Sequence, residues 1–383
     1  MNSLLGAFFN SELSVAKLRN YFDKFAKIRT KHLKPARNVD LKSNNHIAFD
    51  YLKFLLILGV VAIHSNTRID IDASANTWGW GVVNFLSEKL TTICVPCFFI
   101  LSGFLYFNNI ERFSWTIYLN KTKRRIYTLL IPYLIWNIIA LALCLLKYKF
   151  LDYPSFGVIE DGQINIWRLI EGFWDYSYGY PYAFAFWFIR NLIIFIIISP
   201  IAYFIGGLNV LILATFIALL GAFDISLWQF EYFVLGCGLA SFYKKRLFVV
   251  RKSIAIAALI IWVCSATLNL WIDFGGFGHF IRIVCSICGF IALFYFCQNV
   301  LVKLNNSTLT FLASSTFFVY AVHQLFGTIT RKFFVELFGI DTAISGICSF
   351  IFSFLTLIVI SFIIWIIMQK TMPTITKILS GSR

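Results

Sequence analysis

Residues 49–66 read FDYLKFLLILGVVAIHSN, an apolar run that carries three ionisable side chains, Asp50, Lys53 and His64. A helix needs about 20 mostly apolar residues to cross the ~30 Å hydrocarbon core of a bilayer, and this run has about that length. Comparable apolar runs recur from residue 47 to the C-terminal region. The stretch therefore predicts the first of several membrane-spanning helices.

The overall composition also indicates a membrane protein. The chain is 59% hydrophobic and 13% charged, with a mean hydropathy of +0.78. Soluble domains are roughly 45–50% apolar and about 25% charged, and the apolar runs lack the period-two alternation of strand barrels. We predict an all-α, polytopic helical bundle of about ten transmembrane helices. The predicted spans are 47–66, 82–107, 125–147, 184–204, 208–223, 227–243, 253–272, 279–300, 309–329 and 343–368.

The distribution of basic residues predicts the orientation. If the N-terminus is cytoplasmic, the inner segments hold 22 Lys and Arg residues and the outer segments hold 6. The positive-inside rule therefore favours N-in and C-in, in a multi-pass protein of the plasma (inner) membrane. The net charge of +15 is then a topology signal that requires no nucleic-acid partner. The inner segments are 1–46, 108–124, 244–252, 301–308 and 369–383.

Two segments stand apart from the predicted transmembrane domain, 47–368, and its short cytoplasmic tail, 369–383. Residues 1–46 form a basic leader whose apolar residues recur at helical spacing from Val15 to Ile28, which favours an interfacial amphipathic helix; a loosely ordered leader is the alternative. No cleavable signal is evident in it. The outer connection 148–183 is rich in aromatic residues, which favours either stacking on sugar rings or an interfacial aromatic belt.

The cysteines predict neither a disulfide framework nor a metal site. Their number, nine, is odd, and all lie in or beside apolar runs, where cysteine behaves as a small hydrophobic residue. Cys94/Cys97 and Cys285/Cys288 have C-x-x-C spacing, but no histidine or further cysteine nearby completes a zinc ligand set.

The three ionisable residues of the first span share one side of the predicted helix. Lys53 and His64 are eleven residues apart, so they differ by about 20° around the helix axis and by ~16 Å along it. Asp50 lies three residues before Lys53 and can pair with it. Snorkelling of Lys53 and an interfacial position for His64 are the plain alternatives, but the common face favours a functional role.

Further ionisable groups occur in the outer halves of other predicted spans, where charges are expected to face the interior. They can bind an acceptor, orient His64, or form ion pairs that hold the bundle together. The Ser102-Gly103 step favours close helix packing over nucleophilic attack. The ionisable groups are Glu88, Arg190, Glu231, Arg282 and His323.

Several motifs together resemble the acyltransferase 3 family of membrane acyltransferases. The basic residue, ten intervening residues and histidine at Lys53 and His64, preceded by Asp50-Tyr51-Leu52, resemble the signature of that family. The other matching stretches are VPCFFILSGFLYF (95–107), KRRIYTLLIPYLIWN (123–137), FWFIRNLIIFIIISP (186–200), EYFVLGCGLASF (231–242) and VYAVHQL (319–325).

The resemblance implies transfer of an acyl group, commonly acetyl from acetyl-CoA, to a carbohydrate hydroxyl. No permanently bound cofactor is implied. His64 is then the general base or an acyl carrier, and Asp50 and Lys53, on the same helix face, are further catalytic candidates. Trp187, Glu88, Arg190, Glu231, Arg282 and His323 are candidates for binding a carbohydrate or lipid-linked glycan acceptor. The CoA phosphates would meet Lys53, Lys121, Lys123, Arg124 and Arg125, although Arg124 and Arg125 also satisfy the positive-inside rule alone.

The chain departs from the family pattern at position 53 and in its leader. Lysine stands at position 53, where many members have arginine, and the family does not account for the leader.

Two other functions remain open. A transporter or flippase would also bury charges at mid-membrane depth, although it would more often show inverted repeats. A polysaccharide polymerase using a lipid-linked sugar would not need the inner basic cluster.

Overall fold

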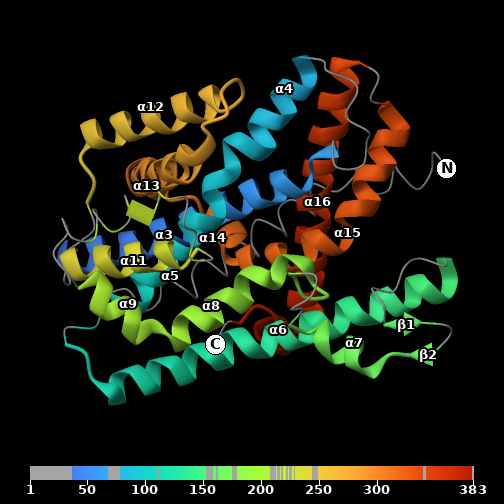
Figure 1. Cartoon of the computed structure of the whole chain (residues 1–383), viewed down its shortest axis with the longest axis horizontal. Coiled ribbons are helices and arrows are strands. Elements are labelled where there is room, and N and C mark those ends of the chain that lie inside the picture. The colour runs from blue at the N-terminus through green and yellow to red at the C-terminus, as the bar shows by residue number, and fades with distance from the viewer. Residues whose placement is uncertain are drawn as a thin grey trace.

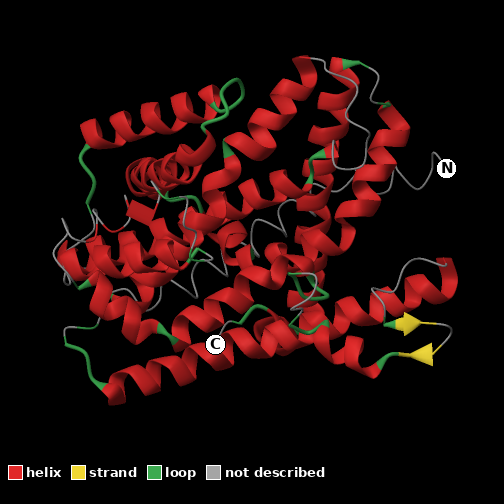
Figure 2. Ribbon diagram, viewed as in Figure 1, coloured by secondary structure: helices red, strands yellow, loops and turns green. Residues whose placement is uncertain are grey.

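The computed structural model describes residues 37–67, 78–151 apart from 109 and 111, 158–160, 163–174, 179–207, 229–243, 249–339 and 342–381, with a few single positions between 213 and 227. The expected amphipathic helix of the leader and the expected span 208–223 lie outside these residues. What is described is a bundle of helices with one small hairpin (Figure 1; Figure 2).

Nearly all of the described residues lie in helices. The first long one, α3 (Arg37–His64), begins well before the predicted span at 47. The others are α4 (Trp78–Asn84), α5 (Cys94–Phe107), α6 (Trp115–Leu151), α7 (Ile166–Glu171), α8 (Trp187–Ile197), α9 (Ser199–Gly206), α11 (Phe230–Tyr243), α12 (Lys252–Leu268), α13 (Gly278–Phe296), α14 (Ser307–Ser314), α15 (Thr316–Phe338), α16 (Ala343–Thr371) and α17 (Pro373–Leu379).

Short segments of 3-10 helix or π-helix join several of these α-helices. A π-helical turn, Phe85–Lys89, and a 3-10 turn, Thr91–Ile93, connect α4 to α5. Similar turns precede α8 and α13 and follow α13: Phe184–Phe186, Gly275–Phe277, Cys297–Leu301 and Val302–Leu304. The hairpin pairs β1 (Ile159–Glu160) with β2 (Gln163–Ile164) in antiparallel fashion and lies near the end of α6 (Figure 1).

The prediction of a helical membrane protein is confirmed. Within the described residues, five helices are long and apolar enough to cross a membrane, and seven if each of two bent pairs is one span. The predicted spans 227–243 and 253–272 coincide with α11 and α12, which have 14 and 17 residues. Because a span needs about 20 residues, the count of ten stays a prediction, as does the N-in/C-in orientation.

Two predicted spans are bent rather than straight. Helices α8 and α9 meet at 70°, and α14 and α15 meet at 60°. Pro200 lies in the first turn of α9, where its missing N–H costs no helical hydrogen bond, so a new helix can start there. At the second bend the hydroxyls of Ser314 and Ser315 donate to Phe311 and Leu312 carbonyls and so satisfy the broken end of α14. Hydropathy measures the length of an apolar run and cannot detect such bends.

The closest helix contact joins α5 and α11 and confirms the expected packing role of the Ser102-Gly103 step. A Cβ added to Gly103 would lie 2.2 Å from the Phe233 carbonyl oxygen, and one added to Gly236 would lie 2.0 Å from the Ile100 carbonyl oxygen. Only glycine permits two helix backbones to approach so closely. This contact fixes α11 against α5 in the middle of the buried core.

Apolar side chains on the outer helices face away from the bundle. Isoleucine, leucine and phenylalanine residues of α12 and α16 are exposed along whole helix faces. Such faces fit contact with lipid chains. Helix α17 packs on α6 and α16, and the Trp136 indole of α6 donates to the Leu379 carbonyl at 3.0 Å, so the predicted tail is partly folded against the bundle.

Candidate active site

His64 is the last residue of α3, and its ring lies against a second histidine. The ring centroids of His64 and His323 are 5.2 Å apart, and His323 is fully buried on α15. The edge of the Phe184 ring completes this contact, with its centroid 5.8 Å from that of His64. Helix α3 packs against α15, which brings together two residues that are far apart in the sequence (Figure 1).

The hydrogen bond made by His323 defines the free nitrogen of its ring. Nδ1 lies 3.1 Å from the Val319 carbonyl oxygen, which can only accept, so Nδ1 carries the proton. In the neutral ring Nε2 is then an acceptor, and among the described residues it has no hydrogen-bond partner. His323 therefore presents an unused acceptor inside the bundle, as a hydroxyl-binding group requires.

Arg331 also reaches this site. Its Nη1 donates to the main-chain carbonyl of His64 at 2.7 Å, and only 6% of the residue is exposed. The predicted span 309–329 ends before Arg331, which would put this residue in the outer connection that follows. The structure instead continues α15 to Phe338. The apolar residues between 333 and 338 were the signal that a longer helix was possible.

The Asp50–Lys53 pair that the sequence analysis expected is confirmed. Lys53 Nζ donates to Asp50 Oδ1 at 2.8 Å, and both side chains are partly exposed. Helix α3 is continuous from Arg37 to His64, so Lys53 keeps a helical separation of ~16 Å from His64 along the axis. The pair lies too far from the His64 ring to touch a group that reacts there.

The predicted basic cluster lies on the N-terminal part of α6. Lys121 donates to the Tyr106 carbonyl at 2.7 Å at the end of α5, and its Nζ lies 5.7 Å from the centroid of the Tyr106 ring. Lys123, Arg124 and Arg125 are exposed. Four basic side chains within five residues form a positive surface that suits a phosphate-bearing ligand.

The remaining predicted acceptor residues divide among different surroundings. Glu88 lies in the π-helical turn and accepts a 2.9 Å hydrogen bond from Asn66, two residues after His64. Trp187 is partly buried at the start of α8. Glu88 and Arg282 are both exposed, against the expectation that these charges face the interior.

Glu231 is almost fully buried and lies beside a histidine that the sequence analysis did not consider. The distance from Glu231 Oε1 to His279 Nε2 is 3.8 Å, longer than a hydrogen bond, and only 7% of His279 is exposed. This pair joins α11 to α13. The common position of both residues in the first turn of adjacent helices could not be derived from hydropathy.

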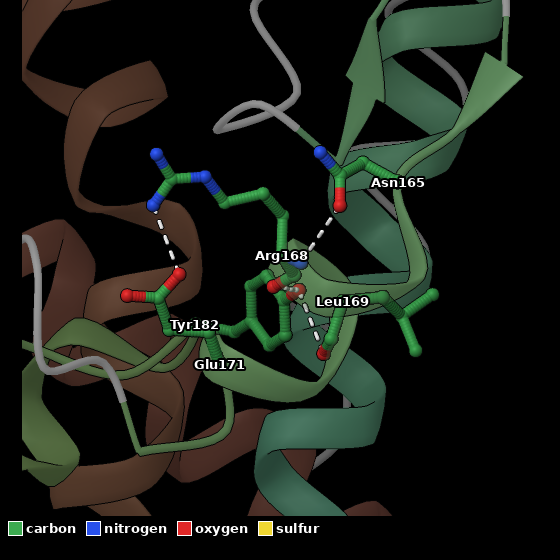
Figure 3. A network of polar contacts seen from close by, with 5 residues as sticks. All are labelled: Asn165, Arg168, Leu169, Glu171 and Tyr182. Carbon is green, nitrogen blue, oxygen red and sulfur yellow. Dashed lines mark hydrogen bonds and ion pairs between the residues drawn. The ribbon is translucent and has the colours of Figure 1, made fainter.

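Arg190 and the outer connection form a folded unit next to the histidine pair. Arg190 donates to the carbonyls of Trp174 at 2.7 Å and Gly179 at 3.1 Å. Figure 3 shows Tyr182 donating to the carbonyls of Arg168 and Leu169, each at 3.1 Å, while Arg168 pairs with Glu171 at 2.9 Å. The described part of the outer connection is therefore held in place rather than free.

This unit places the Phe184 ring against the His64 ring. The Ala183 N–H donates to Asn137 Oδ1 at 3.0 Å on α6, and the Tyr320 hydroxyl donates to the Ala185 carbonyl. Between these two anchors lies Phe184, which contacts the His64 ring on one side and the Tyr180 ring on the other. Aromatic rings in edge-on contacts therefore border the His64 ring on the side of the outer connection.

The described residues contain no group of three or more His, Cys, Asp or Glu side chains placed to hold a metal ion. All nine cysteines are free thiols, and six of them are buried.

The fold and the site define a membrane-spanning helical protein in which the His64 ring lies against the buried His323. The family model for the acyltransferase domain of the acyltransferase 3 family matches residues 46–366, and the chain belongs to that family. This confirms the resemblance drawn from the Lys53 and His64 motif and makes the protein a membrane acyltransferase. Comparison with curated proteins and with solved structures found no match.

Proposed function

We propose that the protein transfers acetyl from cytoplasmic acetyl-CoA to a hydroxyl of a lipid-linked or exported surface polysaccharide in the plasma (inner) membrane. The single observation that carries this proposal is the histidine pair, in which His64 faces the buried His323 with its unused Nε2. A sugar hydroxyl is a poor nucleophile near neutral pH and needs a positioned base. The paired imidazoles of His64 and His323 would supply one.

The reaction follows from the chemistry of the two histidines. One imidazole takes the proton of the acceptor hydroxyl as its oxygen attacks the carbonyl carbon of the thioester. The C–S bond then breaks, CoA leaves as a thiol with the proton returned by the imidazolium, and the acetyl group stays on the sugar oxygen. We assign the proton transfer to His64 and the holding of the hydroxyl to His323. An acetyl-histidine intermediate on His64 is the alternative route.

The donor is proposed to enter from the opposite end of α3. Its phosphates would bind the basic cluster of Lys121, Lys123, Arg124 and Arg125, and its extended pantetheine arm would run past Lys53 toward His64. The ~16 Å between Lys53 and His64 is within reach of such an arm. Asp50 supports this arrangement by neutralising Lys53 when no donor is bound.

The test compares acetyl transfer with transport. Purified protein is placed in vesicles with a lipid-linked oligosaccharide, and release of free CoA thiol is measured with the mass of the glycan. We expect thiol release matched by acetylated glycan. Movement of the glycan across the bilayer without acetyl-CoA consumption would instead identify a flippase, and chain growth without thiol release would identify a polymerase.

Replacing Arg124 and Arg125 together with alanine is expected to weaken acetyl-CoA binding by about tenfold or more, because each charge-assisted phosphate contact is lost. Titration calorimetry with the purified protein measures this affinity. The matched control replaces Lys147 and Lys149, which lie roughly 33 Å away at the other end of α6, and should bind the donor normally. Equal affinity in both double variants would limit Arg124 and Arg125 to a role in topology.

The proposed orientation is tested with single cysteines in a background that lacks the nine native ones. We expect Gln163→Cys, on β2 in the outer connection, to react with a membrane-impermeant maleimide on intact cells, and Lys252→Cys, at the start of α12, to react only after lysis. Both side chains are exposed. Reversed labelling would overturn the N-in orientation.

A further inference from the structure

The end of α3 leaves main-chain carbonyls without helical partners, as every helix end does. The chain beyond α3 satisfies three of them: the Val61 and Ala62 carbonyls accept from the Ser65 amide at 2.9 and 3.2 Å, and the Ile63 carbonyl accepts from the Asn66 amide at 3.3 Å. The carbonyl of His64 is satisfied differently. It accepts from Arg331, on α15 and 267 residues away in the sequence.

Burial of the Arg331 side chain costs free energy that other interactions have to offset. A guanidinium group buried to this degree loses hydration, which must be replaced by hydrogen bonds inside the protein. The negative end of the α3 dipole offers a favourable position for a cation. Arg331 follows His323 by eight residues on the same helix, about 12 Å along its axis. Helix α15 therefore supplies both the partner of the His64 ring and the donor to the His64 backbone.

We propose that Arg331 is a positioning residue, whose guanidinium holds the main-chain carbonyl of His64 and thereby sets the His64 ring against His323. This inference rests on the proposed function, in which His64 takes the proton of the acceptor. Arg331 touches the backbone of His64 and does not itself react. A displacement of about 1 Å in a catalytic group can cost 10²-fold in rate, so fixing the end of α3 has a direct effect on chemistry.

The test measures kcat and the KM for acetyl-CoA in Arg331→Met, which keeps an unbranched side chain and removes every donor. We expect kcat to fall about 10- to 100-fold and the KM to stay within about twofold of wild type, because the donor phosphates bind elsewhere. Arg331→Lys retains one charged donor and should recover part of the loss. The control is Lys332→Met, which removes the exposed cation next to Arg331 on α15 and should leave both constants unchanged.

A double variant separates positioning from other roles. If Arg331 acts only through His64, then His64→Ala combined with Arg331→Met transfers acetyl at the same rate as His64→Ala alone. A further fall in the double variant, by the factor seen in the single one, would overturn the inference. So would wild-type kcat in Arg331→Met, even with a lowered melting temperature.

Where Arg331→Met does not fold, the lysine variant and Arg331→Gln carry the test. Their kcat should fall in the order arginine, lysine, glutamine at constant KM, and an equal kcat in all three would overturn the inference. Failure of the proposed function looks different, because His64→Ala itself would then retain the wild-type rate.

Discussion

Replacing His64 with alanine is expected to slow acetyl transfer by about 10²- to 10⁴-fold, the usual contribution of a general base. Acetyl-CoA binding should stay near the wild-type affinity, because in the proposed mechanism the imidazole acts on the acceptor proton and the CoA phosphates bind the basic cluster on α6. The measurement pairs the initial rate of thiol release with titration calorimetry on the same purified protein.

The matched control for His64 lies on the same helix. His46 is exposed near the start of the described side chains of α3, and His46→Ala should transfer acetyl at the wild-type rate. A rate unchanged in His64→Ala would refute the assigned role. A loss of donor affinity equal to the loss of rate would show that His64 contributes to donor binding instead.

The second large effect concerns the contact between α5 and α11. Gly236→Ala should destabilise the protein by about 3 kcal/mol, the upper end for overpacking, because the new Cβ would lie 2.0 Å from the Ile100 carbonyl oxygen and 2.7 Å from the Phe104 amide nitrogen. Both obstacles are backbone atoms, so no side-chain rotation relieves the clash. Thermal unfolding followed by tryptophan fluorescence in detergent measures the effect.

The control is the same substitution at an open position. Gly81 lies on α4 with nothing within 4 Å of an added Cβ, and alanine is a better helix former than glycine by up to about 1 kcal/mol. Gly81→Ala should therefore unfold at the wild-type temperature or above it. If Gly236→Ala behaves in the same way, α5 and α11 do not pack as closely as described.

The membrane class and the positions of most helices could be predicted from the sequence, because a long apolar run has few alternatives to a spanning helix. The pairing of Asp50 with Lys53 was predictable for the same local reason, since both lie on one helix three residues apart. The close approach at Gly103 was predictable from the small residue itself.

The sequence predicted some residues of the site but not the contacts between them. His64 stood out as an ionisable group in an apolar helix, and so did His323, but nothing in either segment indicates that their rings meet. That contact depends on the packing of α3 against α15 and on the 60° bend before α15, which are tertiary properties. Arg331 was expected in a connection because hydropathy ended its helix at residue 329. His279 was not a candidate because the aromatic, glycine-rich turn before it gave no sign of a buried ionisable pair.

The bond between Arg331 and the His64 carbonyl joins segments 267 residues apart, which has a consequence for biogenesis. During synthesis α3 leaves the ribosome long before α15, so His64 spends most of translation without its ring partner and without its backbone clamp. A nascent or prematurely terminated chain thus carries His64 without the two residues of α15 that contact it. The complete site forms only when most of the chain has been made.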